Sequence, residues 1–395
     1  MNAATASLER ARDCLRRGRI GDAEKLFAEV LSAAPDNIEA LNVMGLAALR
    51  DGALRRAIEL LSKAVRLQPD LHASRLYLAT AMDRSGDVNA ALFQYARTLS
   101  EVQKQNRWVD AQSTPPPLRP LVERAAAVIR AGRRAALDRV IEPLVRRYGH
   151  GELARVEQCA RIYLREEPMV LPDPRQRPSF LFFPGLGASP YLPRSAFAWI
   201  PQMEAAFAGI RAELLTLLQQ DAGRERVFDS EALERDNLRG GLDAPPSWTG
   251  YYFYRHGEKR EDNCAACPRT AEALARVPLV HVRDHGPEVL FSVFTPGTHL
   301  LPHRGVTNTR LVAHLPLIIP QDCALRVGGE LHEWVPGQVV VFDDTYEHEA
   351  WNRSGQTRVV MIFDVWHPGL TEIERAAITD LVAIIGDFRK ATEAV

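Results

Sequence analysis

The stretch that decides the fold of the C-terminal half is residues 338–366, QVVVFDDTYEHEAWNRSGQTRVVMIFDVW. Two apolar runs flank a polar segment that carries Asp, Asn, Ser and Gly as turn signals. Similar runs recur after Pro178: SFLFFP, LVHV, VLFSVF, RLVAHLPLII and ALRVGG. Short runs rich in Val, Ile and Phe between turn residues are typical of an antiparallel sandwich or jelly roll rather than of alternating βα units. We therefore expect a double-stranded β-helix, which is a jelly roll.

Helices are expected on both sides of these strands. Residues 194–220 have helical periodicity, and residues 371–385 begin with Thr371 and Glu374 at the spacing of a capping box. Together with the N-terminal region described next, this pattern predicts an α+β multidomain chain.

The N-terminal region repeats with a period of 34 residues, which is the tetratricopeptide period. Two sets of small residues mark it: Gly18, Gly52 and Gly86, and Ala23, Ala57 and Ala91. Each unit reads as a helix such as IEALNVMGLAALR, a turn with Gly, and a second helix such as LRRAIELLSKAVRLQP. Three units are about the minimum that buries a stacked core. We expect an all-α tetratricopeptide solenoid, which serves either stability and dimerisation or the binding of a peptide partner in a concave groove.

Two Pro-rich breaks divide the rest of the chain, at residues 111–120 and 166–178. The Arg- and Ala-rich segment between them is expected to be an extra helix pair or a bridging element. The predicted domains are therefore residues 1–105 (repeats), 106–175 (a helical linker region) and 176–395 (the β domain with its flanking helices).

Composition limits the possible partners. The formal net charge is -1, so no overall field attracts nucleic acid or an anionic membrane surface. We find neither a signal peptide nor a segment of the ~20 apolar residues that span a bilayer, and we expect a cytoplasmic protein. The five scattered cysteines fit reduced thiols better than a disulfide framework.

Three side chains at the expected strand ends could form a site. His303 follows PGT at the end of the VLFSVF strand, His348 comes 45 residues later, and Arg358 begins the next strand. A jelly roll can bring such positions to one mouth, where imidazoles bind a metal and a guanidinium binds an acidic ligand.

Each of these residues also has a simpler interpretation. His303 could be a polar residue in a strand turn. His348 could belong to an exposed salt bridge with Glu347 or Glu349, and Arg358 could pair with Asp343 or Asp344.

Longer motifs carry a family resemblance. The runs FSVFTPGTHLLPHRGVTNTRLVAHLPL and WVPGQVVVFDDTYEHEAWNRSGQTRVVMIFDVWHP, together with RPSFLFFPGL and YRHGEKREDNCAACPRT, cover roughly residues 175–370. This region resembles the aspartyl/asparaginyl β-hydroxylase family of 2-oxoglutarate- and Fe(II)-dependent dioxygenases.

The resemblance implies a role for several residues. His303 and His348 would hold Fe(II), with Gly305 at the place where other oxygenases have a carboxylate ligand and with water filling the vacancy. Arg358 would bind the C5 carboxylate of 2-oxoglutarate, with help from Ser292 and His314. Animal members have two arginines in the strand RLRMHLGL; this chain keeps Arg310, which would contact the substrate, and has Val312 at the second place.

The leading hypothesis is an enzyme that uses Fe(II), 2-oxoglutarate and O2 to hydroxylate an aspartyl/asparaginyl or related amino-acid-like substrate, free or peptidyl. One alternative is an adaptor built on the repeats, with a catalytically silent jelly roll that senses 2-oxoglutarate. Another is a cupin-like zinc or isomerase site with the same histidines.

Four further residues are not expected to bind the metal or 2-oxoglutarate. Cys264 and Cys267 have the CxxC spacing of a zinc site but lack a second ligand pair, so we expect a loop near the substrate entrance. His332 is in excess of the histidines that the site needs. His367 is expected to be structural, capping the end of a strand.

Overall fold

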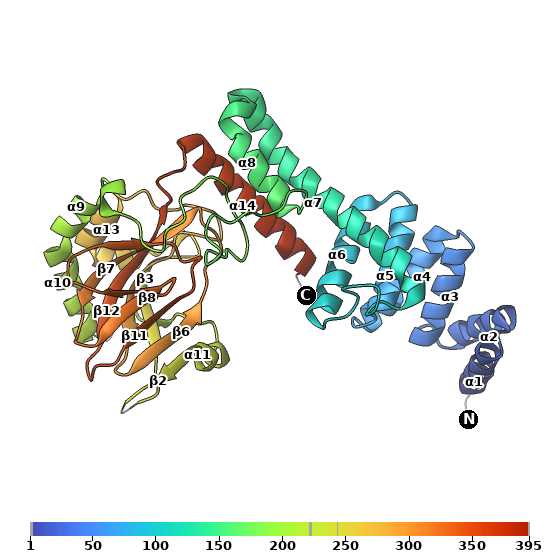
Figure 1. The fold of residues 1–395 in the computed structure, drawn as a ribbon. Helices are drawn as coiled ribbons and strands as arrows, with labels where there is room; N and C mark the ends of the chain where they lie inside the picture. Colours follow the sequence, from blue (N-terminus) through green and yellow to red (C-terminus); the bar gives the residue numbers. More distant parts are fainter. Residues whose placement is uncertain (1–2, 221–222, 243, 394–395) are drawn as a thin grey trace. The chain divides into compact units, whose positions relative to one another are not determined.

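The computed structural model describes residues 3–220, 223–242 and 244–393 (Figure 1). The chain divides into two compact units, residues 1–136 with 387–395, and residues 137–386. None of the helices in the described part of the chain is long and apolar enough to cross a bilayer. All five cysteines are buried free thiols.

The first unit begins with three helix pairs, in agreement with the predicted repeats. Its helices are α1 (Ala3–Arg16), α2 (Ile20–Ala33), α3 (Ile38–Arg50), α4 (Leu54–Leu67), α5 (His72–Arg84) and α6 (Val88–Lys104). The three repeat glycines adopt φ values of 70°, 77° and 91° in the turns, a conformation that Gly reaches without a Cβ penalty. The three repeat alanines are fully buried between paired helices.

The segment between the two Pro-rich breaks forms helices. A 3-10 turn (Pro116–Leu118) leads into α7 (Arg119–Tyr148) and α8 (His150–Tyr163), and the last helix is α14 (Glu372–Glu393). The boundary between the units falls within α7, after Ala136. In the second unit, α8 packs against α14 through a shared apolar cluster that includes Leu153, Val156, Ile378 and Leu381.

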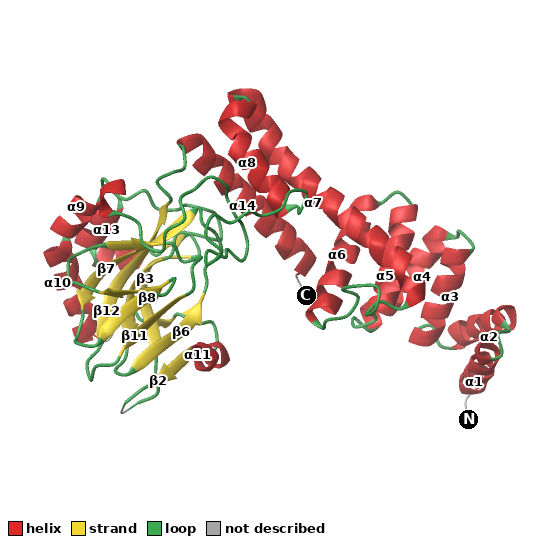
Figure 2. Ribbon diagram, in the orientation of Figure 1, coloured by secondary structure: helices red, strands yellow, loops and turns green. Residues whose placement is uncertain are grey.

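The second unit is built on two antiparallel sheets (Figure 2). The larger sheet has the order β1-β3-β5-β12-β7-β10, with β4 paired to β3, and the smaller has the order β2-β6-β11-β8-β9. The strands are β1 (Glu225–Arg226), β2 (Leu238–Gly240), β3 (Trp248–Arg255), β4 (Glu258–Lys259), β5 (Val289–Phe294), β6 (Thr298–His303), β7 (Arg310–Ile318), β8 (Cys323–Val327), β9 (Glu330–Glu333), β10 (Val340–Phe342), β11 (His348–Asn352) and β12 (Arg358–Trp366).

The two faces of the larger sheet pack against different layers, because successive side chains of a strand point to opposite faces. On β12, Val359, Met361 and Phe363 pack against the layer of helices, whereas Val360 and Ile362 face the smaller sheet. The helices of that layer are α9 (Ile200–Ala205), α10 (Phe207–Gln220) and α13 (Pro268–Leu274), which lie beside the larger sheet in Figure 1; α11 (Glu231–Asn237) and α12 (Glu261–Ala266) complete the unit. The space between the sheets is therefore where inward-pointing polar residues can gather.

Several predicted elements are wrong in detail. The apolar run at 179–184 forms no strand but only a bridge from Leu181 to Thr307, and the run at 279–282 likewise forms only isolated bridges. His303 does not end the VLFSVF strand, because a separate strand, β6, ends at this residue. The expected helix at 194–220 begins only at Ile200 and divides at Ala206.

Candidate functional site

Two neighbouring strands of the smaller sheet bring His303 and His348 together. His303 ends β6, His348 begins β11, and the two residues are direct partners in the antiparallel register. Their ring centroids lie 4.0 Å apart. A register irregularity between His348 and Ala350 accompanies the pairing, and such bulges commonly redirect a side chain next to a site.

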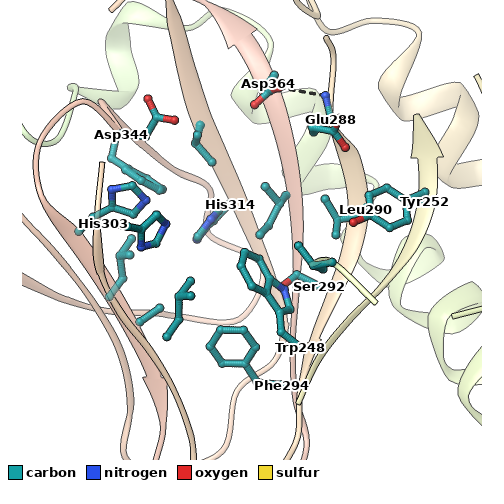
Figure 3. Close-up of a pocket in the computed structure, with 18 of the residues that line it drawn as sticks. Trp248, Tyr252, Glu288, Leu290, Ser292, Phe294, His303, His314, Asp344 and Asp364 are labelled. Carbon is teal, nitrogen blue, oxygen red and sulfur yellow. Dashed lines mark hydrogen bonds between the residues drawn. The ribbon is translucent and has the colours of Figure 1, made fainter. Parts of the chain in front are cut away.

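The pair opens into a cavity of about 420 Å³ between the sheets (Figure 3). Every residue that the sequence pointed to for the iron, the cosubstrate or the substrate lines this one cavity: Ser292, His303, Arg310, His314, His348 and Arg358. Its walls also include Trp248, Leu290, Phe294, Phe342 and Asp344. The fold thus brings together residues that are distant in the sequence, such as Ser292 and Arg358, which are in contact although 66 positions separate them.

Both histidines have a fixed tautomer. His303 Nδ1 donates to the carbonyl of Leu301 at 2.8 Å, and His348 Nδ1 donates to the carbonyl of Tyr346 at 3.0 Å. Because a carbonyl only accepts, each Nδ1 carries the proton and each Nε2 keeps a free lone pair. Burial lowers the pKa of His303, and burial together with His303 lowers the pKa of His348 to about 3. The rings are therefore neutral, which is the form that binds a metal.

Gly305 is required by a carboxylate that reaches the site from another strand end. A Cβ on Gly305 would lie 2.1 Å from Cγ of Asp344, so the Asp344 carboxylate occupies the volume of a side chain at position 305. Asp344 pairs with Arg310, while its Oδ1 is buried without a hydrogen-bond partner. Sequence reasoning missed this role of Asp344, and only its position four residues before His348 could have suggested it.

Arg358 is the most unusual charge in the cavity. It is 1% exposed, its Nε has no hydrogen-bond partner, and it forms no ion pair with any described carboxylate. The guanidinium lies between two aromatic rings, 3.9 Å from the centroid of Phe294 and 4.6 Å from that of Trp334. Burial lowers the pKa of Arg358 to about 9, which still leaves the guanidinium charged at neutral pH, so a bound anion would compensate a poorly solvated positive charge.

Polar groups near Arg358 complete a donor-rich end of the cavity. Ser292 Oγ accepts from Arg358 Nη1 at 3.3 Å and from Trp248 Nε1 at 2.9 Å. Buried ring nitrogens of His314 (Nδ1) and Trp334 (Nε1) have no partner. Because burial, followed by the charge of Arg358, lowers the pKa of His314 well below its usual value, this ring is neutral. No role was predicted for Trp334, although it is the first residue of the motif WVPGQVVVFDD and lies just beyond β9.

Several simpler interpretations are wrong. Arg358 pairs with neither Asp343 nor Asp344, because Asp343 binds Gln176 and Thr345, and Asp344 binds Arg310. Glu347 and Glu349 pair with Arg304, His299 and Arg326 instead of with His348.

The CxxC pair lies away from the cavity. Cys264 belongs to α12 and Cys267 follows it, and both are buried in the core under the helix layer rather than placed in an entrance loop. His332 contacts Tyr191 at 5.5 Å between ring centroids, and His367 Nδ1 accepts from the backbone N–H of Gly369 at 3.0 Å. Across the residues that the structure describes, no three His, Cys, Asp or Glu side chains form a metal-binding cluster.

Comparison with known proteins assigns both a helical repeat and a hydroxylase domain to the chain. The family model of aspartyl/asparaginyl beta-hydroxylase matches residues 204–368, and the tetratricopeptide repeat model matches residues 8–72 and 44–101. The chain therefore carries an aspartyl/asparaginyl beta-hydroxylase domain together with tetratricopeptide repeats.

Relatives with this domain come from animals and bacteria. Human "Aspartyl/asparaginyl beta-hydroxylase" is 37% identical over 37% of this chain and 19% of its own length. "Aspartate beta-hydroxylase domain-containing protein 2" of Xenopus tropicalis is 30% identical over 62% of this chain and 64% of its own length. "Ornithine lipid ester-linked acyl 2-hydroxylase" of Rhizobium tropici is 33% identical over 46% and 62%. The chain thus spans less than two thirds of each of these relatives.

Among solved structures, a Pseudomonas putida prolyl-4-hydroxylase aligns with 41% of this chain and 87% of its own, at 18% identity and a TM-score of 0.24.

Proposed function

We propose that this chain is a dioxygenase dependent on Fe(II) and 2-oxoglutarate that hydroxylates an unactivated carbon of an amino-acid-like or peptidyl substrate. The observation that carries the proposal is one cavity with two neutral, correctly tautomerised imidazoles and a buried guanidinium without a carboxylate partner. In this proposal the two sheets are the halves of a double-stranded β-helix, and the repeats bind a protein partner.

The residues fit the metal and the cosubstrate. Two imidazole nitrogens with free lone pairs suit Fe(II), and the open positions admit other ligands. A planar guanidinium with unused donors suits a carboxylate, which it can bind through two charge-assisted hydrogen bonds. The unpartnered Nδ1 belongs to His314, a residue that lines the cavity and would supply a further polar contact to the same ligand.

Bound together, the metal and 2-oxoglutarate would supply the oxidation: O2 and 2-oxoglutarate are converted to succinate and CO2 while one oxygen atom enters a C–H bond of the substrate. The chain itself would orient these partners. Arg358 and Ser292 fix one end of 2-oxoglutarate, the carbonyls of Leu301 and Tyr346 fix both imidazole rings, and the free Oδ1 of Asp344 can accept from a water beside the histidines.

Replacing Arg358 tests the cosubstrate site. In Arg358→Met, which keeps the volume and removes the charge, we expect 2-oxoglutarate affinity to fall about 100-fold or more, because two charge-assisted hydrogen bonds are lost. The measurement is calorimetry under anaerobic conditions with Mn(II). The matched control is Arg353→Met, at an exposed position where the guanidinium lies over Trp351. Equal affinity in both variants would disprove the proposed site.

Replacing His348 tests the metal site. We expect His348→Ala to abolish stoichiometric Fe(II) binding in anaerobic metal titrations and to stop succinate formation. The reason is that the His303 imidazole and the Asp344 carboxylate, which is already paired with Arg310, cannot hold the ion by themselves. His150→Ala is the control, since its side chain is 78% exposed on α8. If the wild-type protein binds 2-oxoglutarate and iron but forms no succinate, the domain is a silent sensor instead.

A further inference from the structure

The cavity has a second end, whose lining differs from the surroundings of Arg358. Figure 3 shows Asp344, Asp364 and Glu288 along one rim, with Leu290 and Tyr252 beside Glu288. This end is the part of the cavity left for a substrate once the cosubstrate lies at Arg358, so the inference that follows rests on the proposed function.

The arginines at this end are already neutralised. Arg310 donates to Asp364 at 3.2 Å and also to Asp344. Arg255, which also lines the cavity, pairs with Glu225 at 2.6 Å and Asp229 at 3.2 Å. Each guanidinium thus serves two carboxylates of the protein. Among the cavity arginines, Arg358 differs from Arg255 and Arg310 in having no carboxylate partner in the part of the chain that the structure describes, and it is assigned to 2-oxoglutarate.

The carboxylates at this end exceed the cations. Glu288 accepts from the backbone N–H of His256 at 2.5 Å, and its own backbone N–H donates to Asp364 at 2.9 Å. The exposed ring of His256 lies 3.0 Å from Glu288. Burial raises the pKa of both Glu288 and Asp364, which is the effect expected where negative charge is poorly solvated. A substrate carboxylate placed here would meet like charges and no free cation.

An aliphatic strip lies between the two ends. Leu290 and Ile362 are direct partners in neighbouring strands, β5 and β12, and Val312 on β7 is the partner of Asp364 on β12. All three side chains line the cavity. Because they are inward positions on three adjacent strands of one sheet, they form an aliphatic part of the cavity wall, next to His314 and Asp364, which are the strand partners of Ile362 and Val312. Such a wall stabilises a hydrocarbon group and offers nothing to a carboxylate.

We propose that the substrate presents to this cavity an aliphatic group that carries no carboxylate. The pairing of Arg310 with two aspartates removes the remaining basic residue from acid recognition, and the wall of Leu290, Val312 and Ile362 supplies the contact surface. Substrate selection therefore rests on burial of hydrocarbon and on repulsion of acidic groups by Asp364 and Glu288.

The decisive test compares three probes of similar shape: the N-acetyl amides of leucine, asparagine and aspartate. Binding to the full-length protein is measured by NMR titration under anaerobic conditions with Zn(II) and 2-oxoglutarate. We expect the leucine probe to bind at least 10-fold more tightly than the aspartate probe, with asparagine between them. Tighter or equal binding of the aspartate probe would overturn the inference.

The same series is measured without metal and without 2-oxoglutarate, so that the probe preference is obtained whether or not the cosubstrate binds. Failure of 2-oxoglutarate to bind would contradict the proposed function. Normal 2-oxoglutarate binding with a preference for the aspartate probe would contradict only the substrate class.

A charge added to the wall provides a second measurement. In Val312→Arg, we expect affinity for the aspartate probe to rise about 10-fold, because a new cation is placed beside the substrate. The matched control is Val170→Arg, at a position that is 75% exposed, and it should leave all three affinities unchanged. If Val312→Arg folds, binds 2-oxoglutarate and still rejects the aspartate probe, charge does not govern the selection. If this variant does not fold, the binding of the three probes to the wild-type protein decides the inference.

Discussion

The Asp344 carboxylate fills the volume that a side chain at position 305 would need. We expect Gly305→Ala to destabilise the protein by about 1–3 kcal/mol, because its Cβ overlaps the Asp344 carboxylate. Asp344→Ala also destabilises, since Arg310 loses one of its two partners. In the double variant the overlap is gone, so its cost should be less than the sum of the two single costs by about 1 kcal/mol or more. Urea unfolding of all four proteins measures this coupling, and strictly additive costs would contradict it.

His367 should make stability depend on pH. It is buried beside Gly369, and burial, followed by the charge of Arg155, lowers the pKa of His367 to about 4. A pKa depressed below the unfolded value of 6.5 means that the unfolded chain binds the proton more readily. The contribution of the neutral His367 ring to the free energy of unfolding is therefore fully present above about pH 6.5 and is lost as pH falls towards 4. At pH 5 the loss is about 1–2 kcal/mol.

The variant His367→Asn tests this pH dependence. Asn can keep an acceptor for the Gly369 N–H but does not titrate, so the loss of stability between pH 7 and pH 5 should become smaller by that amount. An unchanged difference between the two pH values, measured by chemical denaturation, would show that His367 is not responsible.

Some residues of the site could be predicted from the sequence, whereas others could not. The residues proposed for iron and 2-oxoglutarate stand in long motifs, and the structure gathers them in one cavity. The function of Asp344 depends on how closely its loop approaches Gly305, which no local pattern encodes. Nor could the pattern tell which of Asp343 and Asp344 faces the site, because β10 ends at Phe342 and the strand alternation ends with it.

At the scale of elements, strands were predicted well where their residues are apolar and missed where they carry the two histidines. β5 and β12 have the predicted bounds, since both faces of these strands are buried. β6 and β11 carry His303 and His348 at positions where a structural strand would have apolar residues, so their hydrophobic pattern is broken by function. Conversely, the run at 179–184 is apolar because it packs beside α8 and α14, not because it pairs in a sheet.

The predicted capping box at the start of α14 is present and is joined to α8. Thr371 Oγ1 accepts from the Glu374 N–H at 3.2 Å, and Glu374 accepts from the Thr371 N–H at 2.9 Å. Glu374 also receives two hydrogen bonds from Arg155, at 2.8 and 2.5 Å. The cap therefore does more than end a helix, because it fixes α14 to α8.

We expect Glu374→Ala to destabilise the second unit by about 2 kcal/mol. Breaking a fully buried ion pair would cost more, but Arg155 is partly exposed and its charge is screened by solvent. Thr371→Ala should cost about 1 kcal/mol, which is the loss of a cap alone. Glu372→Ala, at an exposed position in the same turn, is the control. Hydrogen exchange of the α14 amides measures all three, and equal protection in Glu374→Ala and Glu372→Ala would contradict the role of the Arg155 pair.

At the scale of the whole molecule, none of the described residues that line the cavity belongs to the repeats. Every residue that lines the cavity lies between Val227 and Asp364, within the second unit, and the repeat matches end at residue 101. The period of 34 was sufficient to predict the paired helices, since each repeat is a local unit with its own turn and small-residue contact. The cavity was harder to predict because it is built from strands distant in sequence.

This separation can be tested through Gly45 in α3. A Cβ at this position would lie 2.7 Å from Leu61 Cγ, so Gly45→Val should force α3 and α4 apart and cost about 1–3 kcal/mol in the first unit. Gly21→Val in α2 is the matched control, because no atom lies within 4 Å of its added Cβ. In the full-length chain, the helical unfolding transition of Gly45→Val should move to lower urea, whereas the Kd for 2-oxoglutarate without urea should stay within twofold. A parallel loss of 2-oxoglutarate affinity would mean that the repeats contribute to the geometry at Arg358.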